Sequence, residues 1–94
     1  MTEVLSKGER EKKLASQLSD WTVEGKNLYC VRQFPDFVDS IAFVNKLVEP
    51  AIAANHHPDE EISDNKVKII LTTHDAGGLT EKDLALAQVI SGIH

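Results

Sequence analysis

The sequence is poor in several residue classes, and each shortage narrows the possible folds and functions. Its 94 residues include a single cysteine, Cys30, so no intramolecular disulfide can form. Cys30 lies in an apolar segment and is expected to be a small buried side chain. No segment is apolar enough for a signal peptide or a membrane span, so we expect a cytoplasmic protein with no membrane partner. A chain this short has no room for a second core, which predicts one domain over residues 1–94.

Positive charge is also scarce. Ten Lys and Arg stand against fifteen Asp and Glu, which gives a formal net charge of −5, and the basic residues are scattered along the chain. Binding to a phosphate backbone needs concentrated positive charge, so we expect no direct nucleic-acid partner. Small domains without disulfides often depend on subunit contacts for part of their stability. We therefore expect a homodimer or a homotetramer.

The rest of the chain alternates between helical and extended patterns. Apolar residues between Phe37 and Val48 recur every three or four positions, which predicts an amphipathic second helix. Pro50 lacks the N–H that a continuous helix would use, so we expect a kink there, with helix on both sides and an end near Asn55. Capping residues are expected at three helix starts: Ser6 with Glu9, Asp36, and Thr80 with Asp83.

Four extended segments are predicted, in two pairs. They are residues 21–24, residues 28–34, a short segment around Ile62, and residues 67–73. A three-residue loop from Gly25 to Asn27 joins the first pair, and a turn at Asp64 and Asn65 joins the second. The resulting order, α-β-β-α-β-β-α, predicts an α+β fold in which three helices pack on one face of a four-stranded antiparallel sheet.

Three of the four histidines lie in two short segments. His56 and His57 follow the expected end of the second helix, and His74 follows the expected last strand. Such junctions lie at the rim of a layered domain, where side chains can converge on one cleft. Imidazole donates or accepts a proton near neutral pH, so the three residues are candidates for acid–base catalysis. Exposed histidines at loop ends, without a function, are an equally good interpretation of the same pattern.

A metal site is a further interpretation. His56, His57 and His74, with Asp59 or Asp75 nearby, offer nitrogen and oxygen ligands. However, adjacent histidines point apart in an extended chain, and no His-x-x-x-His pair presents two ligands on one helix face. We therefore expect no metal. Nucleophilic catalysis is also disfavoured, because the single cysteine has no activating neighbour in the sequence and no Gly-x-Ser-x-Gly motif occurs.

The two histidine segments also carry a family resemblance. Three blocks, Asn55-His56-His57-Pro58-Asp59, Asn65-Lys66-Val67, and Thr73-His74-Asp75-Ala76-Gly77-Gly78-Leu79-Thr80-Glu81-Lys82-Asp83, resemble the signature of the pterin-4a-carbinolamine dehydratases in residues and in spacing. The resemblance extends upstream through Trp21 and the segment from Phe34 to Phe43, so it covers nearly the whole chain. A bare His-His-Pro would be weakly specific, whereas these blocks at this separation are strongly specific.

The resemblance implies a lyase that works without a metal or an organic cofactor. It would remove water from a 4a-hydroxytetrahydropterin to give quinonoid dihydropterin, in recycling of the tetrahydropterin that aromatic amino acid hydroxylases use. By motif position, His56, His57 and His74 are the implied catalytic histidines. Our hypothesis makes His56 and His74 an acid–base pair and has His57 hold the pterin. Asp83 also matches an active-site position of the family, and we assign it to substrate binding together with His57 and Asp75. Asp83 fits a helix cap equally well, and Asp75 fits an exposed turn.

Two positions depart from the family pattern. Ile52 stands where a polar residue is expected, and Asp64 stands where an aromatic ring would stack on a flat pterin. Trp21 or Tyr29 could supply that ring instead, and Asp64 with the acidic residues 59–61 is expected near the mouth of the pocket. Dehydration is the leading hypothesis, and the departures add weight to an alternative within the same fold. It is a non-catalytic factor with a protein partner, of the transcription-factor dimerisation or Rubisco assembly type.

Overall fold

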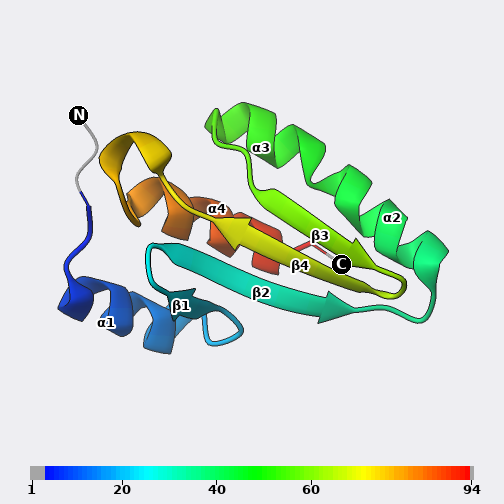
Figure 1. The fold of residues 1–94 in the computed structure, drawn as a ribbon, viewed down its shortest axis with the longest axis horizontal. Coiled ribbons are helices and arrows are strands. Elements are labelled where there is room, and N and C mark those ends of the chain that lie inside the picture. The colour runs from blue at the N-terminus through cyan, green and yellow to red at the C-terminus, as the bar shows by residue number, and fades with distance from the viewer. Residues whose placement is uncertain (1–3, 94) are drawn as a thin grey trace.

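The computed structural model describes residues 4–93, and its elements follow the predicted order (Figure 1). The elements, in chain order, are α1 (Lys7–Gln17), β1 (Thr22–Glu24), β2 (Asn27–Gln33), α2 (Phe37–Lys46), α3 (Val48–Ala54), β3 (Asp59–Ser63), β4 (Lys66–Leu71), the 3₁₀ turn η1 (His74–Ala76) and α4 (Glu81–Ser91). All neighbouring strands are antiparallel, and the strand order in the sheet is β1-β2-β4-β3. The predicted α+β fold with a four-stranded antiparallel sheet is confirmed.

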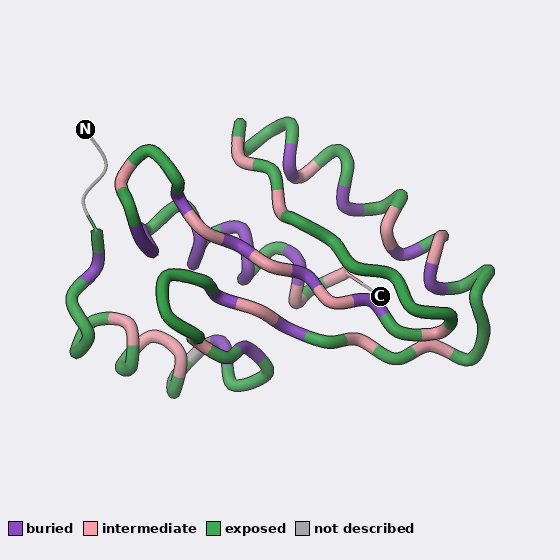
Figure 2. The backbone as a smooth tube through the Cα atoms, viewed as in Figure 1, coloured by how far each residue is buried: buried purple, intermediate pink, exposed green. Residues whose placement is uncertain are grey.

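The core lies between one face of the sheet and the helices. Side chains alternate along the two central strands, and those buried on the helix face are Leu28, Cys30, Val67, Ile69 and Leu71. Burying one aliphatic side chain of this size contributes roughly 1.5–3 kcal/mol, so the β2–β4 pair is the centre of the fold. Figure 2 shows the same alternation along β4, an α4 behind the sheet that is buried along one side, and a fully exposed β3. The expectation that the single cysteine is buried is confirmed.

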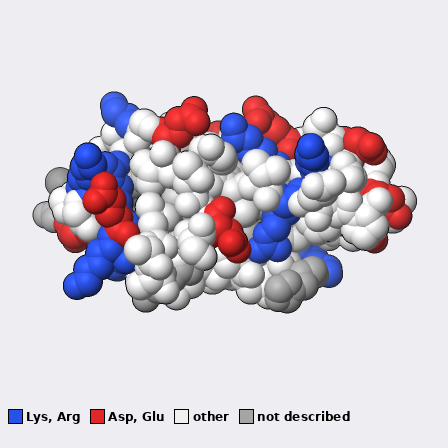
Figure 3. All heavy atoms as spheres, turned by 90° about the horizontal axis from the view of Figure 1, so that it is seen from below, with Lys and Arg blue, Asp and Glu red and all other residues white. Residues whose placement is uncertain are grey.

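The opposite face of the sheet is open, and the surface mixes charges of both signs. On the open face, the Lys68 ammonium lies 4.6 Å from the centre of the Tyr29 ring. Seen from below, basic and acidic groups stand close together, most densely at the end that carries α1 (Figure 3). There Lys13 and Glu81 form an exposed ion pair at 2.6 Å, which contributes little to stability. No helix in the described part of the chain has the length and apolarity needed to cross a membrane.

The second predicted helix is divided in two just before Pro50. α2 ends at Lys46 and α3 begins at Val48, with Leu47 between them. A proline ring collides with the carbonyl four residues earlier, here that of Lys46, and has no N–H to bond with it. Because α2 stops at Lys46, Pro50 falls in the first turn of α3, where an N–H needs no helical partner. α3 ends as expected at Asn55, whose left-handed conformation (φ 51°) turns the chain toward β3.

The first hairpin and the third strand differ from their predicted boundaries. Asn27 pairs with Glu24, so the first loop has two residues instead of three, and Gly25 (φ 62°) provides the left-handed conformation that such a tight turn needs. The acidic residues 59–61 form part of β3, where we had expected them to precede the strand. Their backbone pairs with β4 while their side chains stay exposed, so an edge strand tolerates the charge.

The helix caps predicted for the first two helices are present. The Ser6 hydroxyl accepts a hydrogen bond from the Glu9 amide, and the Ser6 amide donates to the Glu9 carboxylate, as a capping box requires. Hydrogen bonding from Ser6 also lowers the pKa of Glu9. Asp36 caps α2 by accepting from the Asp39 amide at 2.8 Å.

Arg32 ties the C-terminal end of α4 to the sheet. Its side chain reaches from β2 across the helix face and donates to the carbonyls of Ile90, Ser91 and Ile93 at 3.3, 3.3 and 3.0 Å. Carbonyls at a helix end lack intrahelical donors, and a positive charge there is also favoured by the helix dipole. The guanidinium lies 5.3 Å from the centre of the Phe43 ring, a cation–π contact. α4 is therefore fixed against β2 at its C-terminal end, and its other end carries part of the candidate site.

Candidate active site

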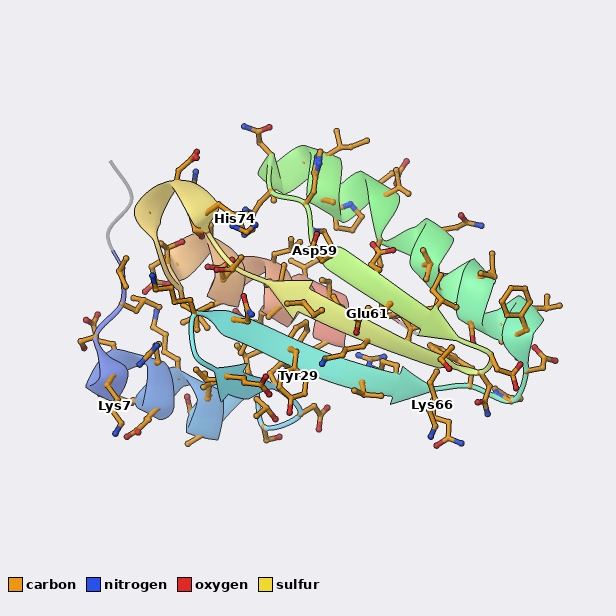
Figure 4. All side chains as sticks on the ribbon, in the orientation of Figure 1. Lys7, Tyr29, Asp59, Glu61, Lys66 and His74 are labelled. Carbon is orange, nitrogen blue, oxygen red and sulfur yellow. The ribbon has the colours of Figure 1, made fainter. Side chains whose placement is uncertain are left out.

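The three predicted histidines line one cavity, where β4 stops and β3 starts. His56 and His57 lie in the link from α3 to β3, and His74 begins η1 just after β4. The start of β3 pairs with the end of β4, Asp59 with Ile70, so the two segments come together, and Figure 4 shows His74 close to this start of β3. The cavity has a volume of about 350 Å³, the size of a small-molecule site. Its lining residues are Asn55, His56, His57, Thr72, Thr73, His74, Asp75 and Lys82.

A tight loop holds His74 at the cavity. The strand predicted to run through Thr73 ends at Leu71, because the chain turns back and Thr73 forms an isolated antiparallel bridge with Gly78. The Gly77 amide donates to the carbonyls of Thr73 and His74 at 3.0 and 3.1 Å. Gly77 has φ 78°, a conformation that side-chain-bearing residues rarely adopt. The loop therefore has a defined shape that a glycine makes possible.

Asp83 lies beneath the cavity and is fully buried. Its Oδ2 accepts hydrogen bonds from the Thr73 hydroxyl at 2.8 Å and from the Thr80 amide at 2.9 Å. Its Oδ1 lies 2.5 Å from Nε2 of His56. The Thr80 contact completes the predicted capping box of α4, and the His56 contact joins the helix start to the cavity wall. The same carboxylate therefore caps α4 through the Thr80 amide and contacts the cavity wall through His56.

The cavity is polar and contains groups that can move protons. His57, His74, Asp75 and Lys82 are exposed, while the side chain of His56 is only 12% exposed. Imidazoles can donate or accept protons near neutral pH. Such a set of groups can protonate a leaving hydroxyl and remove a proton from a ring N–H of a bound molecule. Within residues 4–93, no three His, Cys, Asp or Glu side chains are grouped as a metal site requires.

Some residues of the cavity were not predicted from the sequence. Asp75 lines the cavity as expected, whereas Asp83 lies behind His56 and does not line it. The sequence did not single out Thr73 or Lys82 as candidates. For Thr73, the available signal was its place directly before His74, at a strand end on the face that should be buried. For Lys82 it was the position inside the capping box, in the first turn of the helix that follows the His74 loop.

None of the five aromatic residues lines the cavity. Trp21 is buried in the core, where its Nε1 donates to the Ser91 hydroxyl at 2.9 Å. Tyr29 lies on the open face of the sheet (Figure 4), next to Lys68. Neither supplies the stacking ring that the sequence left open. Asp64 is also not near the mouth as expected, because it forms the β3–β4 turn (φ 52°), at the opposite end of both strands from the cavity (Figure 1).

A second groove adjoins the cavity at His57. It has a volume of about 310 Å³ and lies between the α2–α3 pair and β3. Ile52, 65% exposed, lines this groove and not the histidine cavity. Glu60 lines the opposite side, and burial, with a contribution from the charge of Asp59, raises its pKa. The departure at Ile52 therefore falls in the apolar groove that His57 also lines, and not in the cavity where the three histidines meet.

Comparisons with known proteins give a consistent result. The model of the family described as pterin 4 alpha carbinolamine dehydratase matches residues 3–93. A protein of Trichormus variabilis named "Putative pterin-4-alpha-carbinolamine dehydratase" is 65% identical over 80 residues, which are 85% of this chain and 86% of that protein. Among solved structures, a transcriptional coactivator/pterin dehydratase from Brucella melitensis matches with a TM-score of 0.87 and 26% identity, covering 95% of this chain and 96% of that one.

A more distant solved structure shares the fold alone. It is a pterin dehydratase-like protein identified as a RuBisCO assembly factor in the alpha-carboxysome. It matches with a TM-score of 0.58 and 18% identity, and the match covers 79% of this chain and 89% of that one.

Proposed function

The chain belongs to the pterin 4 alpha carbinolamine dehydratase family, and from that premise we propose that it is a lyase acting on a 4a-hydroxytetrahydropterin. The reaction removes the 4a-hydroxyl as water and leaves a quinonoid dihydropterin. In the cell this step would return the pterin to a form that a reductase can recycle. The proposal needs no metal and no organic cofactor, because proton transfer by side chains is sufficient for the chemistry.

One observation carries the proposal. His56, His57 and His74 come from two links that are separated by the whole β3–β4 hairpin, yet they line one cavity of small-molecule size. Exposed loop-end histidines without a function would have no reason to converge, whereas these three line one cavity. The buried carboxylate behind His56 adds to this, because buried charge is expensive unless it has partners.

The chemistry assigns a role to each histidine. A hydroxyl is a poor leaving group unless it is protonated, and the electron pair of the neighbouring ring nitrogen pushes it out. The ring then loses an N–H proton to give the neutral quinonoid product. We assign these two proton transfers to His56 and His74 and the binding of the pterin chiefly to His57. A positioned acid and base contribute about 10²–10⁴-fold to a rate.

Lys82 and Asp75 complete the proposed binding site. Both are exposed at the cavity, and they carry opposite charges. A pterin ring offers a carbonyl oxygen and an amino group at its pyrimidine edge, which a lysine and a carboxylate can bind. No ring stacks on the pterin in this arrangement, so hydrogen bonds would carry more of the binding.

The test is a direct dehydratase assay. A 4a-hydroxytetrahydropterin is generated immediately before mixing, and its dehydration is followed by ultraviolet absorbance with and without the protein. We expect acceleration above the spontaneous rate, saturating with substrate, and its loss in the double variant His56→Ala/His74→Ala. A rate equal to the spontaneous one, with circular dichroism showing folded protein, would contradict the proposal.

A binding role is the second candidate, and exposed apolar side chains on α2 and α3 favour it. Phe37, Val38, Val48 and Ile52 are 51%, 72%, 52% and 65% exposed. Exposed apolar groups gathered on neighbouring elements often mark a contact with another protein. One occupant would be a second copy, which gives the proposed homodimer or homotetramer; another would be a protein partner, as the assembly role of the distant structural relative suggests. Light scattering after size-exclusion chromatography, repeated with Val38→Lys, distinguishes the two, because only self-association would give a larger mass in the pure protein.

A further inference from the structure

A chain of hydrogen bonds runs through the floor of the cavity and ends on Asp83. The Lys82 amide donates to the Thr80 hydroxyl at 3.3 Å, and the hydroxyls of Thr80 and Thr73 lie 2.8 Å apart. The Thr73 hydroxyl also lies 2.8 Å from Oδ2 of Asp83, to which it donates. Thr73 and Thr80 are both buried, so water does not compete for these contacts.

The donor and the acceptor in each of these hydrogen bonds follow from counting the hydroxyl hydrogens. A hydroxyl has one hydrogen to donate. Thr73 uses it on Asp83, so the bond between the two threonines must be donated by Thr80. The hydroxyl of Thr80 is free to do this because it accepts from the Lys82 amide. Every hydrogen bond in this series is therefore donated in the direction of Asp83.

Asp83 in turn fixes the state of His56. Its Oδ2 accepts two hydrogen bonds, from Thr73 and from the Thr80 amide, which fits an ionised carboxylate. An ionised Oδ1 can only accept, so in this arrangement Nε2 of His56 carries the hydrogen and donates it. In the neutral imidazole one nitrogen carries the hydrogen, so the other, Nδ1, is bare and can take a proton. Within residues 4–93, no partner is seen for Nδ1.

We propose that Thr73 is a positioning residue that acts through Asp83, and that it holds His56 with hydrogen on Nε2 and with Nδ1 as the reactive nitrogen. The role of Nδ1 in dehydration rests on the proposed function, whereas the state of the imidazole does not. Without the Thr73 hydroxyl, Oδ2 keeps only the Thr80 amide. The carboxyl group can then rotate or take up a proton and donate it to Nε2, which moves the hydrogen of His56 to Nδ1. Thr73 thus decides whether Nδ1 of His56 is bare and able to accept a proton.

The experiment compares Thr73→Val, which keeps the shape and removes the hydroxyl, with Thr73→Ser, which restores a hydroxyl. Long-range proton–nitrogen NMR of the full chain reports the tautomer of each histidine, and His56→Gln identifies the signals of His56. We expect hydrogen on Nε2 in the wild type and in Thr73→Ser, and a mixture of tautomers in Thr73→Val. Thr22→Val makes the same change on the open face of β1 and is expected to leave the His56 signals unchanged.

Kinetics provide the second readout. Thr73→Val should lower kcat about tenfold with KM within about twofold, because an interaction that acts on proton transfer and not on binding has been lost. Thr73→Ser should recover most of kcat. A merely structural role for Thr73 would lower the stability of Thr73→Val without changing the tautomer of His56.

Either of two results would overturn the proposal. The first is a wild type in which His56 carries its hydrogen on Nδ1, and this measurement needs no variant to fold. The second is a folded Thr73→Val with the wild-type tautomer and wild-type kcat. A wild type with the expected tautomer but no dehydratase activity would contradict the proposed function and support the assignment of the imidazole.

Discussion

Nε2 of His56 and Oδ1 of Asp83 lie 2.5 Å apart, across the junction between the α3–β3 link and the first turn of α4. Asp83 is fully buried and also completes the capping box of α4. The start of one helix and the orientation of one imidazole therefore depend on the same carboxylate. A change at Asp83 should affect stability and activity together, and the two effects can be measured separately.

The first prediction concerns Asp83→Asn. The amide keeps one acceptor oxygen but places an NH₂ group where the carboxylate accepts from Thr73 or faces His56. One buried contact is lost or reversed, which should lower the free energy of unfolding by roughly 1–3 kcal/mol, measured by urea denaturation. Dehydratase activity should also fall. Asp75→Asn removes the same charge from an exposed position, and there we expect a change within about 0.5 kcal/mol. Equal stability of the two variants would contradict the structural role of Asp83.

The second prediction concerns the histidines. His56→Ala and His74→Ala should each lower kcat about 10²–10⁴-fold, because each would remove a positioned acid or base. His57→Ala should mainly raise KM, since its proposed role is binding. Steady-state kinetics with circular dichroism as the folding control measure all three. If His74→Ala kept full dehydratase activity, the acid–base pair would be wrongly assigned.

The third prediction concerns Glu60 and pH. Burial raises the pKa of Glu60, so just above its ordinary value of 4.5 the folded state binds a proton more readily than the unfolded state. The free energy of unfolding therefore falls as pH rises through that range, and this loss persists at neutral pH. Glu60→Gln cannot ionise, so its Tm relative to the wild type should be higher at about pH 7 than at about pH 4. The effect should be small, because Glu60 is largely exposed.

Glu61→Gln is the matched control for Glu60→Gln. It removes the same charge from the next residue of β3, whose side chain lies on the open face of the sheet, opposite Lys68. Thermal unfolding of both variants is followed by circular dichroism at the two pH values. If the Tm difference between Glu60→Gln and the wild type were the same at both pH values, burial would have no effect on the ionisation of this carboxyl.

The fourth prediction concerns the single thiol. Cys30 is buried in the core on β2, and burial raises the pKa of its thiol. The thiolate is the form that reacts with disulfide reagents, so the native protein should react slowly with Ellman's reagent. Adding guanidinium to unfold the chain should increase the rate at least about tenfold. Rapid reaction in the native state would show that the β2–β4 core opens more easily than its packing indicates.

Much of the fold could be predicted because local patterns and tertiary packing agree. Val67, Ile69 and Leu71 alternate and are buried on one face, and the capping residues occur where helices begin. The break in the second helix was placed at Pro50, whereas it occurs at Leu47. A proline acts on the carbonyl four residues before it, and so the helix that precedes it must end earlier.

The candidate site could be predicted only in part. The two histidine segments were visible because histidine is a chemically distinctive residue and both follow element ends. Thr73 and Lys82 were missed, since their roles depend on which residues meet across the junction of β4 and α4. The position of Asp64 was misjudged for a related reason. Asp64 is only seven residues after His57 in the sequence. Those residues form an extended strand, which places Asp64 at the far end of the sheet.

α4 is anchored at both ends by side chains of other elements. Arg32 of β2 holds its last carbonyls, and Thr73, which follows β4, holds its first turn through Asp83. Helix ends usually fray long before a domain unfolds, and their amide hydrogens exchange with solvent through these local openings. Here fraying at either end would first have to break a contact to β2 or to Thr73. The amide hydrogens of α4 should therefore exchange only when the sheet itself opens. Helix and sheet would then form one cooperative unit, and the cavity at the end of β4 would stay assembled between unfolding events.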